Sequence, residues 1–187
     1  MNIIFLDMDG VINCSNEIDK WKKENGFESF NLEAVEKFKQ IYCLNPKGLY
    51  PYYIVPELLN RFNEMYSKIQ NCRIVWTSSW RLTVKRDSKP FINGLYYQCG
   101  FPEGSFLSYT PELRNNLRAD EILLWIKTFR QSYEINKCAI IDDLEEANPY
   151  VNEYLGVPIK FFKTEMESGL TQKIADDILK YFNEERK

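Results

Sequence analysis

Two carboxylates end an apolar stretch of the chain. In the segment IIFLDMDG, Asp7 and Asp9 follow the apolar residues 3–6, and Gly10 comes next. A short apolar run bounded by turn-prone residues predicts a buried strand, and alternate residues of an extended segment point to the same side. Asp7 and Asp9 can therefore share one site, with Gly10 allowing a sharp turn. One carboxylate could attack phosphorus while the other moves a proton.

Polar side chains also follow two further apolar stretches. RIVWTSSWR predicts a strand that ends in the hydroxyl residues Thr77 and Ser78, and CAIIDD places Asp142 and Asp143 after another apolar run. If these strands are parallel neighbours, their polar ends meet at one edge of the sheet, where ligands bind in such folds. Buried carboxylates that meet there repel each other. A Mg²⁺ ion held by oxygen ligands would resolve this conflict.

The composition removes several other chemistries. The chain has no histidine, which excludes Ser–His–Asp hydrolysis, Cys–His proteolysis and histidine-bound zinc. Acid–base catalysis must therefore use Asp, Glu, Lys, Tyr or Cys. The five cysteines are widely scattered and form no CxxC pair, which argues against a zinc ribbon or a thioredoxin-like redox site.

The bulk properties indicate a folded protein of modest size. The 187 residues suggest one domain, and the 44% hydrophobic content is typical of a globular chain. The net charge of −3 fits a dedicated nucleic-acid binder poorly. With no N-terminal signal peptide and no long apolar run, we expect a soluble chain of cytoplasmic type. Export by a specialised secretion system remains compatible with the sequence.

Alternating patterns along the chain predict an α/β fold. Apolar residues at helical spacing predict helices at 31–42, 56–69, 118–129 and 169–182. Short apolar runs predict strands at 3–6, 73–77, 138–141 and 158–162, with a further short strand possible at 105–108. Residues 13–30 are expected to form a loop or flap, and 82–117 to be mostly irregular. Strands alternating with helices predict a parallel sheet.

Three segments carry a family resemblance. FLDMDGVIN, IVWTSSWR and AIIDD resemble motifs I, II and IV of the haloacid dehalogenase (HAD) superfamily of phosphohydrolases, in the same order. The SSWR ending and the stretch TPELRNNLRADEILLWI are similar to small HAD domains grouped with Swiss Army Knife RNA-repair proteins. The resemblance covers about residues 3–170. It implies a three-layer α/β/α, Rossmann-like HAD fold around a central parallel sheet.

The resemblance also implies roles for the residues in these motifs. Asp7 would be the nucleophile and a metal ligand. Asp9 would be the general acid and base, with its backbone carbonyl on Mg²⁺. Thr77 would bind the phosphoryl group. Asp142 and Asp143 would complete the metal site, one directly and the other through a water molecule, with the order left open.

The family pattern further requires a basic residue near the start of the helix before the last motif. Arg118 is our choice, because it opens the predicted helix at 118–129. Its rivals are Arg114, Lys127 and Lys137. Arg118 could equally be a solvated helix-start arginine, or pair with Glu121 or Glu112.

Further candidates for substrate binding lie close to the two main motifs. They are Gly10, Asn13, Ser78, Ser79 and Arg81. The competing interpretation is structural: Thr77 and Ser78 could be ordinary strand-end residues, and Trp80 and Arg81 could pack and cap the segment after the strand.

The spacing of the motifs leaves no room for a full cap domain. We expect a single HAD-like catalytic domain over 1–187, with a flap and small insertion at 13–55 and an irregular segment at 82–117. An uncapped site favours a phosphorylated macromolecule, and the acidic charge favours protein over nucleic acid. Aromatic residues suggest phosphotyrosine as a target: Trp21, Tyr50, Tyr52, Tyr53 and Trp80. The alternatives are a nucleotidase or polynucleotide 3′-phosphatase, and a non-catalytic binding module that keeps the fold.

Overall fold

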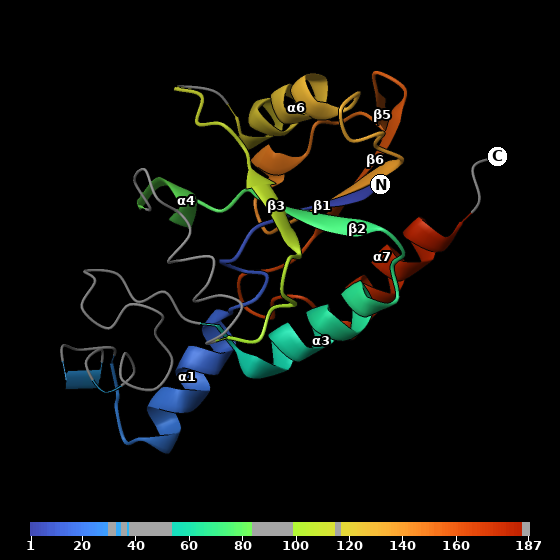
Figure 1. Ribbon diagram of the computed structural model, residues 1–187. Coiled ribbons are helices and arrows are strands. Elements are labelled where there is room, and N and C mark those ends of the chain that lie inside the picture. The colour runs from blue at the N-terminus through green and yellow to red at the C-terminus, as the bar shows by residue number, and fades with distance from the viewer. Residues whose placement is uncertain (30–32, 35–36, 38–53, 84–98, 115–116, 185–187) are drawn as a thin grey trace.

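The computed structural model describes residues 1–29, 33–34, 37, 54–83, 99–114 and 117–184. These residues contain a six-stranded sheet in the order β3-β2-β1-β4-β6-β5 (Figure 1). The strands are β1 (Asn2–Leu6), β2 (Cys72–Trp76), β3 (Phe106–Tyr109), β4 (Lys137–Asp142), β5 (Glu153–Tyr154) and β6 (Val157–Lys163). All neighbours pair in parallel except β5, which runs antiparallel to β6.

Helices cover both faces of the sheet. They are α1 (Ser15–Glu24), α3 (Pro56–Ser67), α4 (Trp80–Thr83), α6 (Arg118–Phe129) and α7 (Gln172–Asn183), with a 3₁₀ turn η1 (Glu145–Ala147). Helices α3 and α7 lie side by side on one face, and α6 lies on the other (Figure 1). The result is a mixed α/β fold with three layers, which confirms the fold class predicted from the sequence.

The central strand β1 explains this layering at the level of single residues. Its side chains alternate, so that Ile4 and Leu6 join the apolar cluster under α3 and α7, while Ile3 and Phe5 join the cluster under α6. All four side chains are fully buried. A strand that is covered on both faces needs a continuous apolar run, which is the pattern of residues 3–6.

The main helices begin where local sequence signals place them. Pro56 occupies the first turn of α3 and needs no backbone N–H there. At α7, the Thr171 hydroxyl accepts a hydrogen bond from the Ile174 N–H at 3.3 Å. Helix α6 covers residues 118–129, as the periodicity predicts. The predicted helices at 56–69 and 169–182 correspond to α3 and α7.

The expectation of a loop at 13–30 is wrong, because α1 occupies most of that stretch. Its apolar side is narrow: Ile18 and Trp21 pack against Val55 and Leu58. Two apolar residues in one short helix are too few for a sequence pattern to reveal. Trp21 is buried, and its ring stacks on that of Phe27 with 5.6 Å between the ring centroids. It is therefore a packing residue rather than part of a substrate pocket.

Several other predictions fall outside the described residues. Most of the predicted helix at 31–42 and all of Tyr50, Tyr52 and Tyr53 lie there, as does most of the insertion on which the absence of a cap depends. The missing cap and the flap stay predictions. Within the described ranges, none of the helices combines the length and the apolar character that a membrane span requires.

Candidate functional site

The polar residues that follow three neighbouring strands form one row. Asp7 follows β1, Thr77 follows β2 and Thr110 follows β3. Each donates its backbone N–H to a carbonyl of the neighbouring strand at 3.0 Å. The row continues to Asp142, the last residue of β4, because β1 and β4 run in register to their ends. The expected convergence at the carboxyl edge of the sheet is confirmed.

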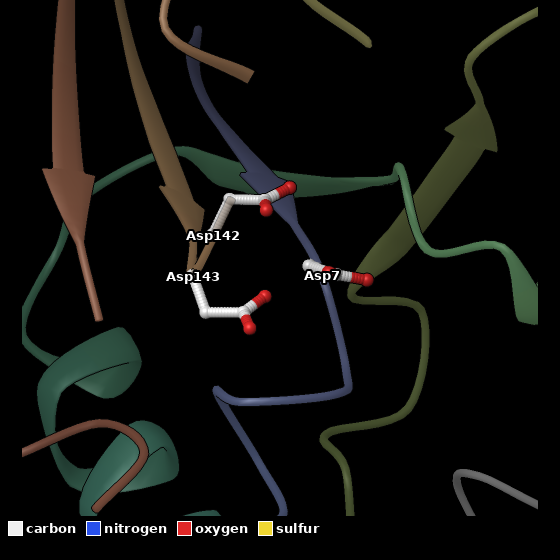
Figure 2. Close-up of side chains that lie close together, drawn as sticks. All are labelled: Asp7, Asp142 and Asp143. Carbon is white, nitrogen blue, oxygen red and sulfur yellow. The ribbon is translucent and has the colours of Figure 1, made fainter. Parts of the chain in front are cut away.

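Three carboxylates come together at this edge. Asp7, Asp142 and Asp143 each offer an oxygen, and these oxygens lie within 4.8 Å of one another. Figure 2 shows the side chains of Asp142 and Asp143, at the end of β4, extending toward the side on which Asp7 lies. Asp7 and Asp142 are buried, and Asp143 is half-buried. The side chain of Asp9 is not part of this cluster.

Arg118 joins two of these acids. Its Nη1 atom donates to Asp7 Oδ2 and to Asp142 Oδ2, at 2.6 Å each. Burial alone would lower the pKa of Arg118, but the charges of Asp7 and Asp142 outweigh it and raise the pKa above its usual value. The guanidinium is therefore a fixed positive charge in the site.

One guanidinium does not balance three carboxylates. Burial, reinforced by the charge of Asp7, raises the pKa of Asp142 to about 7 and that of Asp143 to about 6. These carboxyl groups gain charge with difficulty unless a further cation is present. Oxygen ligands without histidine or thiolate suit Mg²⁺.

Three polar atoms of the row are buried without a hydrogen-bond partner among the described residues. They are Asp7 Oδ1, Thr77 Oγ1 and Thr110 Oγ1. Leaving such atoms unpaired costs free energy unless a ligand or ion completes them. The orphaned carboxylate oxygen of Asp7, together with the acidic cluster, fits a divalent cation. The orphaned hydroxyl of Thr77 fits a donor to a phosphoryl oxygen.

Gly10 lets the loop after β1 pass close to Asp143. Its φ is +66°, in the left-handed region that favours glycine. A Cβ atom added at Gly10 would lie 2.5 Å from Asp143 Cγ and 2.7 Å from its Oδ2. The expected turn is confirmed, and glycine has a second role here that its neighbours in the sequence do not reveal.

Asp9 is held by neutral donors. Asn13 Nδ2 donates to Asp9 Oδ1 at 2.8 Å, and Trp80 Nε1 donates to Asp9 Oδ2 at 2.7 Å. Asn13 also accepts the backbone N–H of Gly10 at 3.0 Å. Burial raises the pKa of Asp9, while the hydrogen bonds from Asn13 and Trp80 oppose that rise. Asn13 therefore lies in the site as a support for Asp9.

The remaining candidates after β2 lie in different surroundings. Ser78 is buried, and its hydroxyl accepts the Trp80 backbone N–H at 3.3 Å. Ser79 is exposed. Arg81 contacts Glu121 and three backbone carbonyls of this edge. These contacts match the structural interpretation of Arg81, in which it caps the segment after the strand.

In the described part of the chain, the ion pairs with Asp7 and Asp142 are made by Arg118 and not by its rivals. Lys137 begins β4 at the opposite edge of the sheet, where its Nζ donates to the carbonyls of Tyr181 and Glu184. Arg114 and Lys127 have exposed side chains. Arg118 is also not the partner of Glu121, which pairs with Arg81 instead.

Sequence reasoning named Trp80 as a candidate for an aromatic pocket and Glu121 as a possible partner of Arg118, but it missed the contacts that the two residues make, with Asp9 and Arg81 respectively. The indole of Trp80 reaches an acid 71 positions away, and no local pattern encodes such a contact. Glu121 did carry a signal, since it lies on the buried side of α6 beside Ile122 and Trp125. A charged residue on the apolar side of a helix indicates a buried partner.

Comparisons with known proteins agree with the fold and the acidic site. A family model described as the HAD domain in Swiss Army Knife RNA repair proteins matches residues 3–175, which include all three motifs and the basic residue of α6. Neither a curated protein nor a solved structure gives a match. The match spans most of the 187 residues, and the chain therefore belongs to the family of HAD domains in Swiss Army Knife RNA repair proteins.

Proposed function

We propose that the chain is a Mg²⁺-dependent phosphomonoesterase that forms an aspartyl phosphate on Asp7. The observation that carries this proposal is Arg118 bonded to both Asp7 and Asp142, with Asp143 completing an acidic cluster within 4.8 Å. A nucleophilic carboxylate beside a fixed cation and a metal-binding cluster is the arrangement that phosphoryl transfer needs. Membership of the HAD domain family supports the same class of reaction.

The first step would transfer the phosphoryl group to Asp7. A carboxylate oxygen of Asp7 attacks phosphorus, and the bond between phosphorus and the leaving oxygen breaks. The Thr77 hydroxyl, which has no partner among the described residues, is available to donate to a phosphoryl oxygen. Arg118 holds Asp7 in place and offsets the negative charge of the reacting groups.

Asp9 would move protons in both halves of the cycle. As the P–O bond breaks, protonated Asp9 gives its proton to the leaving oxygen. The resulting carboxylate then takes a proton from the water that attacks the aspartyl phosphate, which releases inorganic phosphate and restores Asp7. A pKa raised by burial suits this dual role, because the group must be protonated in one step and ionised in the next.

The acidic cluster would hold the Mg²⁺ ion. The carboxylates of Asp7, Asp142 and Asp143 are candidate ligands, together with the backbone carbonyl of Asp9. When bound, the ion would supply positive charge against the phosphoryl oxygens and relieve the repulsion within the cluster.

We further propose a phosphorylated nucleic-acid end as the substrate. The family is named for RNA repair, which favours the polynucleotide 3′-phosphatase alternative. The net charge of −3 and the aromatic residues pointed instead to a phosphoprotein or phosphotyrosine. Little supports that preference: Trp21 is buried in a packing cluster and the Trp80 indole is bonded to Asp9, while Tyr50, Tyr52 and Tyr53 lie outside the described residues and stay untested.

A substrate panel tests both levels of the proposal. We expect Mg²⁺-dependent phosphate release from a 3′-phosphorylated oligonucleotide, faster than from a phosphotyrosine peptide, with loss in EDTA and in Asp7→Asn. Faster turnover of the phosphopeptide would overturn the substrate while leaving the chemistry. Absence of turnover on every phosphate ester, in a folded protein that binds Mg²⁺, would favour the non-catalytic module.

A further inference from the structure

Arg81 and Glu121 form a buried ion pair beside the site. Arg81 Nη2 contacts Glu121 Oε2 directly. The side chains are 6% and 9% exposed, respectively. Glu121 belongs to α6, one turn after Arg118, and Arg81 belongs to the one-turn helix α4 that follows Thr77. The pair therefore links the segment just after Thr77 to the first turn of α6, where Arg118 lies.

The other donors of Arg81 are used on the same edge of the sheet. Its Nη1 donates to the carbonyl oxygens of Thr77 and Ser78, and its Nε donates to that of Thr110 at 3.2 Å. These residues follow β2 and β3. One planar guanidinium thus fixes two strand ends at once, which a lysine ammonium could not do with the same geometry.

Glu121 is equally occupied. Its second oxygen, Oε1, accepts the backbone N–H of Leu113 at 3.0 Å. Leu113 belongs to the segment that leads from β3 to α6. Each oxygen of the carboxylate therefore has a donor, and the buried charges are compensated by hydrogen bonds.

We propose that Arg81 and Glu121 are a positioning pair that sets the separation between Thr77 and Arg118. The proposal rests on the proposed phosphomonoesterase function, because it assigns Thr77 and Arg118 to the phosphoryl group and to Asp7. It differs from the expectation that Arg81 binds the substrate. Arg81 acts through the carbonyls of the loop after β2, and Glu121 acts through the first turn of α6.

The pair is a sensitive point for catalysis. Thr77 and Arg118 come from different elements, and each must meet the same phosphoryl group. Displacement of a catalytic group by about 1 Å can reduce a rate by about 100-fold without loss of folding. Loss of the pair should therefore lower kcat more than it raises KM, since misplacement affects the transition state most.

The test uses conservative variants in the full chain. Arg81→Lys keeps the charge but not the planar fork, and Glu121→Gln keeps the shape but not the charge. With a 3′-phosphorylated oligonucleotide and Mg²⁺, we expect kcat to fall about 10- to 100-fold in each, with KM nearly unchanged. The double variant should lose little more than either single one, because the two residues act as a unit.

Matched controls come from the same elements. Arg73→Lys makes the same exchange at an exposed position of β2, where Arg73 donates to the carbonyl of Cys72. Asp120→Asn removes an exposed charge from the first turn of α6 and keeps a side-chain oxygen that can accept the Leu117 backbone N–H. Both should keep the wild-type kcat. Thermal unfolding of every variant verifies that the kinetic comparison is made between folded proteins.

A second readout does not depend on turnover. The ¹⁵N-labelled guanidinium signal of Arg118, assigned by its loss in Arg118→Lys, should move in Arg81→Lys, because the pair sets the position of the first turn of α6. Absence of wild-type turnover would overturn the proposed function, and this signal would then decide the positioning pair. An unmoved signal overturns the pair, as does unchanged kcat. A higher KM at unchanged kcat would show direct substrate binding by Arg81 and overturn it too.

Discussion

Asp7 and Asp9 are two positions apart in the chain, yet their surroundings are opposite. Asp7 lies among charged groups: Arg118 holds one oxygen, two other carboxylates are close, and the second oxygen has no partner among the described residues. Asp9 lies among neutral donors, with one hydrogen bond to each oxygen. Under the proposed function, this difference explains how one short motif would supply both a nucleophile, held by charged groups, and a proton carrier, held by neutral hydrogen bonds.

The largest expected effect comes from removing the titrating group. Asp9→Asn keeps the shape of the side chain and can accept one of the two hydrogen bonds, but it cannot carry the proton, so kcat on an alkyl phosphate ester should fall by about 10²–10⁴-fold. The loss should be smaller for para-nitrophenyl phosphate, whose leaving oxygen needs no proton. Asp177→Asn, on the exposed side of α7, serves as the control in steady-state assays. An equal loss on both substrates would contradict the role of Asp9.

Gly10→Ala tests the close approach between the loop that carries Asp9 and Asp143 of the acidic cluster. The new Cβ would lie 2.5 Å from Asp143 Cγ, so either the loop or the acid must shift. We expect weaker Mg²⁺ binding by calorimetry and a loss of kcat of about 100-fold.

The matched control for this change is Gly156→Ala. Gly156 also has a positive φ, of +80°, but a Cβ there would meet nothing within 4 Å. It should lose stability through backbone strain of about 1–3 kcal/mol and keep its metal affinity. Equal Mg²⁺ affinities of the two variants would contradict the contact with Asp143.

Trp80→Phe tests the neutral hydrogen bonds that hold Asp9. It removes one donor from Asp9, and a hydrogen bond to a charged group contributes about 1.5–3 kcal/mol. Since that bond lowers the pKa of Asp9, its loss should raise the pKa and move the alkaline limb of the kcat profile to higher pH. Because Asp9 would then keep, among the described residues, only its hydrogen bond from Asn13, we also expect its positioning to suffer, and kcat at the pH optimum to fall by about tenfold, equivalent to about 1.4 kcal/mol.

The control for Trp80 is Trp125→Phe. Trp125 belongs to α6, and its indole donates to Ser108 Oγ of β3 at 2.8 Å rather than to Asp9. It should lower thermal stability without moving the pH–rate profile. A shifted pH–rate profile in Trp125→Phe, or an unshifted one in Trp80→Phe, would contradict the claim that the Trp80 hydrogen bond sets the pKa of Asp9.

The smallest expected effect is a pH dependence of folding stability that arises from Asp142 in the acidic cluster. Burial raises the folded-state pKa of Asp142 to about 7, so the folded chain holds a proton that the unfolded chain releases at lower pH. Without metal, the contribution of Asp142 to the free energy of unfolding is fully present below the pKa that Asp142 has in the unfolded chain. It is lost as the pH rises toward and through 7. Each kcal/mol lost should lower Tm by about 2–4 °C.

Thermal unfolding in EDTA between pH 5 and 8 measures this decline. Mg²⁺ should raise Tm more at pH 8 than at pH 5, and Asp142→Asn should flatten the metal-free slope. A metal-free protein whose Tm rises across this range would contradict the raised pKa of Asp142.

The sequence predicted the residues of the site better than the contacts that hold them. The apolar runs before Asp7, Thr77 and Asp142 were sufficient to predict three parallel strands, because buried strands require them. The start of α6 at Arg118 followed from helical periodicity. The link from Trp80 to Asp9 could not be predicted, since it depends on how two loops meet after the sheet has formed.

The missed helix α1 illustrates a second reason. Its buried contact rests largely on Trp21, and most of its surface is charged, so neither periodicity nor capping marks it. Cys14 gives no side-chain cap at its start. Tertiary packing against α3 then decides a structure that local propensity leaves open.

The position of β1 in the sheet has a consequence for the order in which the protein is made. β1 pairs with β2 on one side and with β4 on the other, so Asn2 lies opposite both Cys72 and Lys137. During synthesis on the ribosome, Asp7 emerges long before Asp142 and Asp143. The mutually repelling acids cannot meet until β4 inserts beside β1, a long-range closure that is slow in parallel sheets. The acidic cluster therefore cannot form until β4 has been synthesised, which is after β1, β2, β3 and α6 but before β6 and α7.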